Sequence, residues 1–137
     1  MSSKKSSAPF GLPGKQIALM ENILFYLGLT FLIIHEMDAI RCKEWRILPL
    51  LSLLDDKNGQ TVFLFMHIPL FAWIFYSLPP HPGSDLFMVA FDIFMIIHIG
   101  LHLLLLKNKK NEFKDWISWL LIVGAGVFGG LHLWVGT

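Results

Sequence analysis

Histidines and carboxylates interrupt the apolar stretches of this sequence, where ionisable side chains are rare. Such a group costs several kcal/mol inside a membrane unless it is paired, so each one is a candidate functional residue. Neutral imidazole binds zinc, iron, copper and nickel, and a carboxylate adds a hard oxygen ligand and negative charge. These residue types indicate a transition-metal site, and the residues concerned are His35, Glu36, Asp38, His67, His98 and His102.

Four apolar segments are long enough to carry these residues through a bilayer. A helix needs about 20 mostly apolar residues to cross ~30 Å of hydrocarbon. Charged or Pro/Gly-rich turns separate the segments, which run over about residues 20–40, 61–78, 86–106 and 116–135. The sequence therefore predicts an all-α fold, an integral membrane bundle of four transmembrane helices over residues 20–137. A disordered N-terminal tail rich in Ser, Lys, Pro and Gly is predicted over residues 1–19.

Most of the candidate residues are predicted to lie at a similar depth in the membrane. Counted from the face where the first helix ends, at ~1.5 Å per residue, His102 lies roughly 7 Å deep, and His67 and His98 about 12–13 Å. His35 lies about 8–15 Å deep, and Asp38 falls in the same layer. In bundles, metal ligands project inward from facing helices. We therefore predict a zinc or iron site with His35, His67, His98 and His102 as ligands. Asp38, or Glu36 in its place, is a fifth ligand or orients one of these histidines.

Two carboxylates are the candidates for acid–base chemistry beside such a metal. Glu36 points about 100° away from His35 around the helix, and Asp38 shares the face of His35. Either one could act as general base if the protein is a metal-dependent enzyme acting on a lipid or a small apolar substrate. Two other functions stay open. One is a b-type haem protein that uses His67 with His98 or His102. The other is a non-catalytic subunit whose histidines bond between helices.

The composition excludes several classes of protein. Hydrophobic residues make up 55% of the chain and charged residues 15%, whereas a soluble domain carries about a quarter charged residues. Lipid is therefore the expected surroundings. The net charge of +1 provides no basic field for nucleic acid. The single cysteine, Cys42, excludes an intrachain disulfide.

Basic residues predict how the chain lies in the membrane. Eight of them follow the first and third segments: Arg41, Lys43, Arg46, Lys57, Lys107, Lys109, Lys110 and Lys114. The opposite side has lysines only in the tail. Short loops rich in Lys and Arg stay in the cytoplasm. We therefore predict a multi-pass protein of the cell (inner or plasma) membrane with both termini on the non-cytoplasmic side.

Further residues of the third and fourth segments have predicted structural roles. Asp92 and His132 lie within the spans, nearer the opposite face of the membrane from the histidine layer, and can pair with each other. Gly126 and Gly130 form a small-xxx-small pair, which permits close helix packing within the chain or in a homo-oligomer.

The stretch from His35 to Arg41, followed by Glu44-Trp45-Arg46, resembles a family of small, uncharacterised bacterial four-helix membrane proteins. In that family an HE-x-DA motif closes the first helix, and further histidines follow in the second and third helices. The resemblance covers about Met20 to the C-terminus. It implies the four-helix topology and no established activity, because the family is a domain of unknown function.

Overall fold

The fold was analysed in a computed structural model, which describes residues 14–136 and their side chains from residue 22 onward. Its four long helices are α1 (Gly14–Arg41), α2 (Asp56–Ser77), α3 (Ser84–Leu105) and α4 (Trp116–Gly136). Two short 3-10 turns, η1 (Glu44–Arg46) and η2 (Leu51–Leu53), connect α1 to α2. The described residues contain no strand, so the predicted all-α class and its four helices are confirmed. The predicted tail lies outside the described residues up to residue 13, and α1 already includes residues 14–19.

Each long helix can cross a membrane by its length and composition. The spans are Asn22–Arg41, Asp56–Ser77, Ser84–Leu105 and Trp116–Gly136. Large apolar side chains cover their outer faces; Phe65 on α2 and Leu104 on α3 are 67% and 79% exposed. A soluble monomer rarely exposes continuous apolar surface of this kind, whereas lipid solvates it. The chain is therefore a membrane protein.

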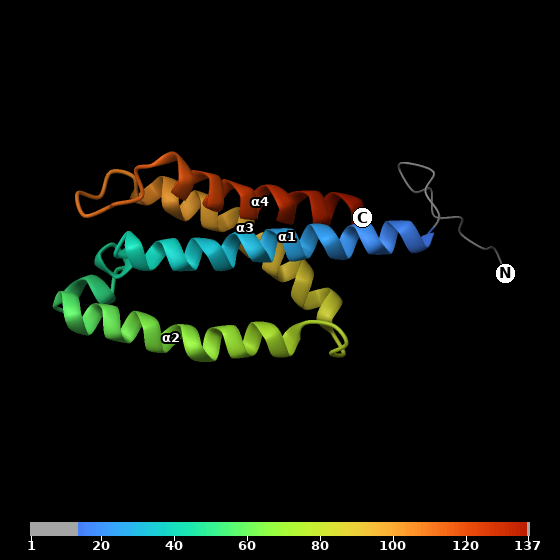
Figure 1. The fold of residues 1–137 in the computed structure, drawn as a ribbon, viewed down its shortest axis with the longest axis horizontal. Helices are drawn as coiled ribbons and strands as arrows, with labels where there is room; N and C mark the ends of the chain where they lie inside the picture. Colours follow the sequence, from blue (N-terminus) through green and yellow to red (C-terminus); the bar gives the residue numbers. More distant parts are fainter. Residues whose placement is uncertain (1–13, 137) are drawn as a thin grey trace.

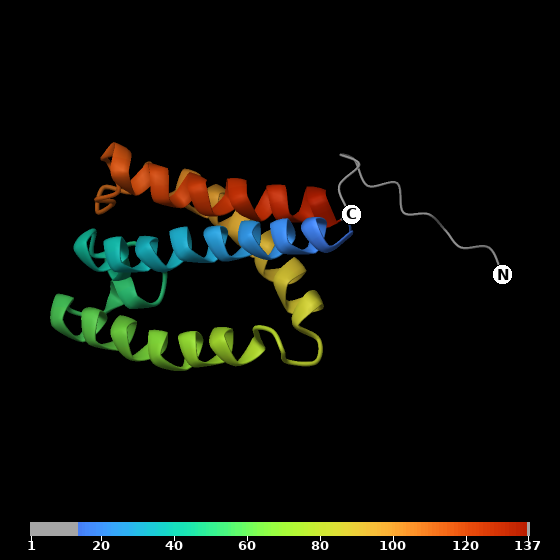
Figure 2. The same cartoon turned by 45° about the vertical axis from the view of Figure 1, so that its right-hand side comes forward.

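Helix α4 packs closely on both α1 and α3, whereas α2 packs mainly on the connecting turns η1 and η2 (Figures 1 and 2). In both views α4 runs beside α1, α3 crosses behind them, and α2 lies on the opposite side of α1 from α4. Buried apolar side chains form two clusters. One is Phe25, Leu29, Leu32, Ile74, Met88, Phe91, Met95 and Ala125. The other is Ala39, Cys42, Trp45, Ile47, Leu51, Phe63, Phe113 and Ile122, and it lies where the connecting turns meet the helices.

Glycines on α4 allow it to approach α3 closely. A Cβ placed on Gly126 would lie 2.3 Å from Cδ1 of Ile99 and 3.1 Å from the carbonyl oxygen of Met95, both on α3. A Cβ on Gly129 would lie 3.3 Å from the Asp92 backbone. At Gly130 the nearest atom would be 3.9 Å away. Gly126 therefore serves packing within the chain.

A polar network fixes the end of α1 against the start of α4. Asp38 accepts hydrogen bonds from Arg41 Nε at 2.7 Å and from Ser118 Oγ at 2.5 Å. Arg41 also donates to Asp115 at 2.6 Å. Asp115 in turn accepts from the backbone N–H of Ser118 at 2.8 Å, which satisfies an orphan donor at the start of α4.

A second network holds the connector between α1 and α2. Arg46 forms a two-pronged pair with Asp56, with both N···O distances 2.7 Å, and Trp45 Nε1 donates to the same carboxylate at 2.9 Å. Arg46 also reaches Glu112 in the loop between α3 and α4 at 3.1 Å. Bidentate Arg–carboxylate pairs fix geometry as well as charge. The connector is thus tied to both neighbouring turns.

The glycine contacts predict a contrast between two substitutions of the same type. Gly126→Ala should destabilise the protein by about 1–3 kcal/mol, the usual cost of overpacking a core. Gly130→Ala should be neutral or stabilising by up to ~1 kcal/mol, because alanine is the better helix former. Unfolding by sodium dodecyl sulfate from mild detergent micelles measures both. Equal effects of the two variants would contradict the packing described for α4.

Candidate metal centre

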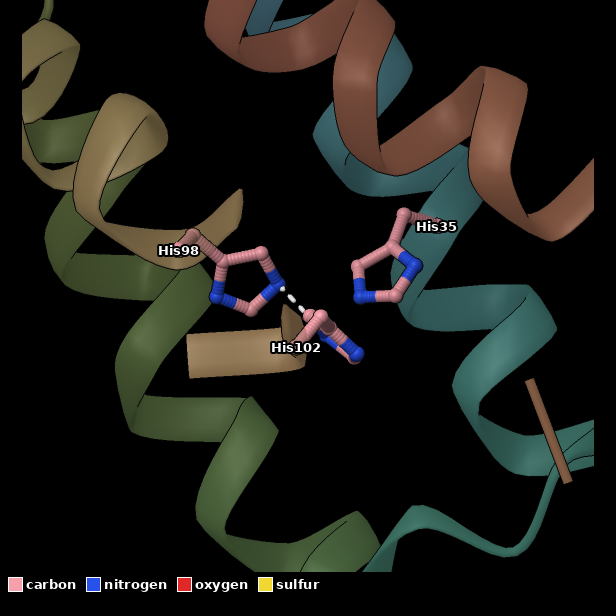
Figure 3. A group of neighbouring side chains, drawn as sticks. All are labelled: His35, His98 and His102. Atoms are coloured by element: carbon pink, nitrogen blue, oxygen red, sulfur yellow. Dashed lines mark hydrogen bonds between the residues drawn. The ribbon is translucent and has the colours of Figure 1, made fainter. Parts of the chain in front are cut away.

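Three histidines converge between α1 and α3 (Figure 3). His98 and His102 stand one turn apart on α3, and their side chains meet His35 of α1. All three are buried, and each offers a ring nitrogen that lies within 4.8 Å of those offered by the other two. The rings also contact edge to face, with centroids 4.6–5.0 Å apart.

The nitrogens of this cluster are poorly satisfied by the protein. His98 Nε2 and His102 Nε2 lie 3.1 Å apart. Both nitrogens of His35 and Nδ1 of His102 are buried and have no hydrogen-bond partner among the described residues. Unpaired buried polar atoms are costly. A tetrahedral zinc ion with Zn–N bonds of 2.0–2.1 Å holds its nitrogens about 3.3–3.4 Å apart. The donor set therefore fits a transition-metal ion.

Glu44 of η1 brings a carboxylate to the cluster. Its Oε1 lies 3.7 Å from His102 Nε2, and its side chain is buried. Burial, together with the nearby charge of Glu36, raises the pKa of Glu44 to about 8, against the opposite effect of His67. Lys43, in the left-handed conformation with φ 50°, directs the chain into the turn that carries Glu44. Neither depth nor helical spacing marks Glu44 as a site residue in the sequence, although it stands in the Glu-Trp-Arg stretch after the first span.

Phe113 covers the cluster from the loop between α3 and α4. Its ring centroid lies 4.7 Å from that of His102 and 5.4 Å from that of His35. Its backbone N–H donates to Asn111 Oδ1 at 2.8 Å, and its carbonyl accepts from Trp119 Nε1 at 3.2 Å. Asn111 itself donates to Leu105 O at the end of α3. These bonds hold an apolar cover over the histidines, which limits access of water.

The fourth predicted histidine ligand, His67, is placed apart from this group. Its Nδ1 lies 2.6 Å from the carbonyl oxygen of Phe63, and its Nε2 lies 2.9 Å from Glu36 Oε2. A carbonyl only accepts, so Nδ1 carries a hydrogen. For Nε2 and Glu36 Oε2 to form a hydrogen bond as well, a second proton must lie between the imidazole ring and the carboxyl group. Both nitrogens are therefore engaged. The pair borders a pocket of about 170 Å³ between α1 and α2, with a mainly apolar lining that includes Met37 and Phe71.

Asp38 and Cys42 are bound to partners other than the three histidines. Both carboxylate oxygens of Asp38 are taken by Arg41 and Ser118, as described above. The thiol of Cys42 lies 3.7 Å from Asp38 Oδ2 and 3.8 Å from Ser118 Oγ. Burial raises the pKa of the Cys42 thiol to about 11, so it stays protonated at neutral pH. Asp38 thus connects α1 with α4 instead of joining the histidine cluster.

Residues 21–137, which contain all of these side chains, match the model of a family described as Family of unknown function (DUF6713). The chain belongs to this family. The resemblance noted in the sequence is thereby supported at the level of a domain of unknown function. Searches of curated proteins and of solved structures gave no match.

In this member of DUF6713, one further buried pair lies away from the cluster. Asp92 of α3 and His132 of α4 contact each other through Oδ2 and Nδ1, and both are buried. The predicted pairing is confirmed. Asp92 Oδ1 has no partner among the described residues. The ring of Phe25 packs on His132 with centroids 5.5 Å apart.

This pair predicts a non-additive response to mutation. His132→Leu should cost about 3–5 kcal/mol of stability, because it leaves the buried carboxyl of Asp92 unpaired. The double variant Asp92→Leu/His132→Leu should be more stable than His132→Leu alone, since apolar replacements of a buried pair are often neutral. Free energies of unfolding in detergent complete the double-mutant cycle. Strictly additive losses would show that the two side chains do not depend on each other.

Proposed function

We propose that the protein is a membrane metalloprotein that binds one zinc or iron ion through His35, His98 and His102, with Glu44 as the fourth ligand. The observation that carries this proposal is the convergence of three buried imidazoles whose nitrogens largely lack partners. Imidazole nitrogen with a carboxylate oxygen is a donor set that suits these metals. Glu44 would lose its proton on binding the cation and then supply negative charge that offsets the charge of the ion.

The alternative of histidines that merely bond between helices fits this cluster less well. Histidines with that role have their nitrogens paired, as His132 has with Asp92 and His67 with Glu36. In the cluster, the hydrogen bond between the rings of His98 and His102 is the only one that the described residues provide to these nitrogens. Haem is also a poorer fit. The 3.1 Å contact leaves no room for a macrocycle between these rings, and both nitrogens of His67 are engaged.

A metal held by these four residues would be able to take a water or a carbonyl oxygen as a fifth ligand and activate it. We further propose that the protein is a metal-dependent enzyme acting on a lipid or a small apolar substrate. Glu36 is suited to an acid–base role, because it is hydrogen-bonded to His67 and borders the apolar pocket between α1 and α2. Asp38 fits a positioning role, since its oxygens fix the end of α1. The eight basic residues near the connecting turns support a cytoplasmic location for that end.

Metal content is the direct test of the centre. Protein purified without a His tag in mild detergent should contain one metal equivalent per chain by inductively coupled plasma mass spectrometry. His98→Ala/His102→Ala should lose it, because two of three imidazoles are gone. His67→Gln should retain it, because His67 lies outside the cluster. Folded wild-type protein that takes up no zinc or iron, or a double variant that still binds metal, would refute the centre.

Glu44 is tested separately by a matched pair of carboxylates. Glu44→Gln should weaken zinc binding by about 10–100-fold, the range seen when a group that supports a metal site is removed. Asp85→Asn should leave binding unchanged, because Asp85 is exposed in the first turn of α3, at the opposite end of that helix from His98 and His102. Zinc titration against a competing chelator measures both affinities. Equal affinity of Glu44→Gln and the wild type would assign the fourth position to water.

A further inference from the structure

A basic pocket of about 430 Å³ lies beside the turns, separate from the histidine cluster. Lys109, Lys110 and Lys114 of the loop between α3 and α4 line one wall. Leu51 and Leu54 of the connector line another. The cavity therefore presents cationic groups and apolar surface together.

The three lysines are available to a ligand. The acidic residues of the pocket, Asp56 and Glu112, are both bound to Arg46, with N···O distances of 2.7 and 3.1 Å. The ammonium groups of the lysines form no ion pair within the part of the chain that the structure describes. Four basic side chains against two acidic ones leave the lining positively charged. This pocket attracts an anion.

The pocket lies at the level of lipid headgroups. Its residues fall just beyond the spans, which end at Arg41 and Leu105 and begin again at Asp56 and Trp116. The connector beside it is apolar on its outer side, where Leu50 and Leu53 are 80% and 82% exposed. Exposed leucines next to a membrane face are solvated by acyl chains. The apolar side of the pocket thus continues toward the hydrocarbon.

We propose that this pocket binds the phosphate group of an anionic phospholipid. The lysines donate charge-assisted hydrogen bonds to the phosphate oxygens, and basic pockets at membrane surfaces hold anionic headgroups in this way. The leucines contact the first part of the acyl chains. A soluble phosphate ester would use the lysines alone, so the apolar wall favours the lipid. The proposal does not depend on the metal centre.

Native mass spectrometry of detergent-solubilised protein titrated with phosphatidylglycerol or phosphatidylcholine tests the pocket. Phosphatidylglycerol should bind more tightly. Lys109→Gln/Lys110→Gln/Lys114→Gln should weaken its binding by about 100-fold, since each basic residue near a membrane surface contributes roughly a fivefold factor. The matched control Lys43→Gln/Lys57→Gln/Lys107→Gln removes equal charge at the same face but spares the lining, so binding should change little.

Equal weakening by the two triple variants would overturn the proposal, because it would indicate a diffuse basic face. Millimolar inorganic phosphate that displaced phosphatidylglycerol completely would assign the pocket to soluble phosphates and overturn the lipid assignment. Circular dichroism and thermal unfolding in zwitterionic lipid check that both variants are folded. A triple variant that is folded and still binds phosphatidylglycerol like the wild type would also refute the pocket.

Discussion

The cost of burying a polar group in hydrocarbon governs how this structure is arranged. No bulk water is present in a bilayer core to satisfy it, so each ionisable side chain needs a partner from the protein or a ligand. Asp92 has His132, Glu36 has His67, and Asp38 has Arg41 and Ser118. The three converging histidines depart from this rule. Their unmatched nitrogens distinguish these histidines, which could hold a metal ion, from the structural pairs around them.

Two loops outside the spans also contribute side chains to the histidine cluster. The turn after α1 brings Glu44 toward His102, and the bonds of Arg46 to Asp56 and Glu112 hold that turn in place. The loop after α3 brings Phe113 over the rings, fixed through Asn111. A carboxylate and an apolar cover therefore reach the histidines from outside the spans.

The spans and most of the histidine cluster could be predicted from the sequence, because depth follows from residue count and an i, i+4 pair shares a face. Depth is only one coordinate, however. His67 has the right depth, but its ring nitrogens meet Phe63 and Glu36. Asp38 faces α4 because of Arg41 and Ser118. Glu44 could not be predicted, because its position depends on the conformation of the turn after α1, and the periodicity of apolar residues gives no information about that turn.

Folding and metal binding are coupled if the centre is occupied as proposed. Without an ion, both nitrogens of His35 are buried without a hydrogen-bond partner among the described residues, and Phe113 packs against the ring. The chain then has two ways to lower that cost, which are to admit water or to separate α1 from α3. Either one loosens the contact between α1 and α3. An ion that binds only the closed arrangement stabilises it by mass action. The centre would therefore hold α1 against α3 as well as perform chemistry.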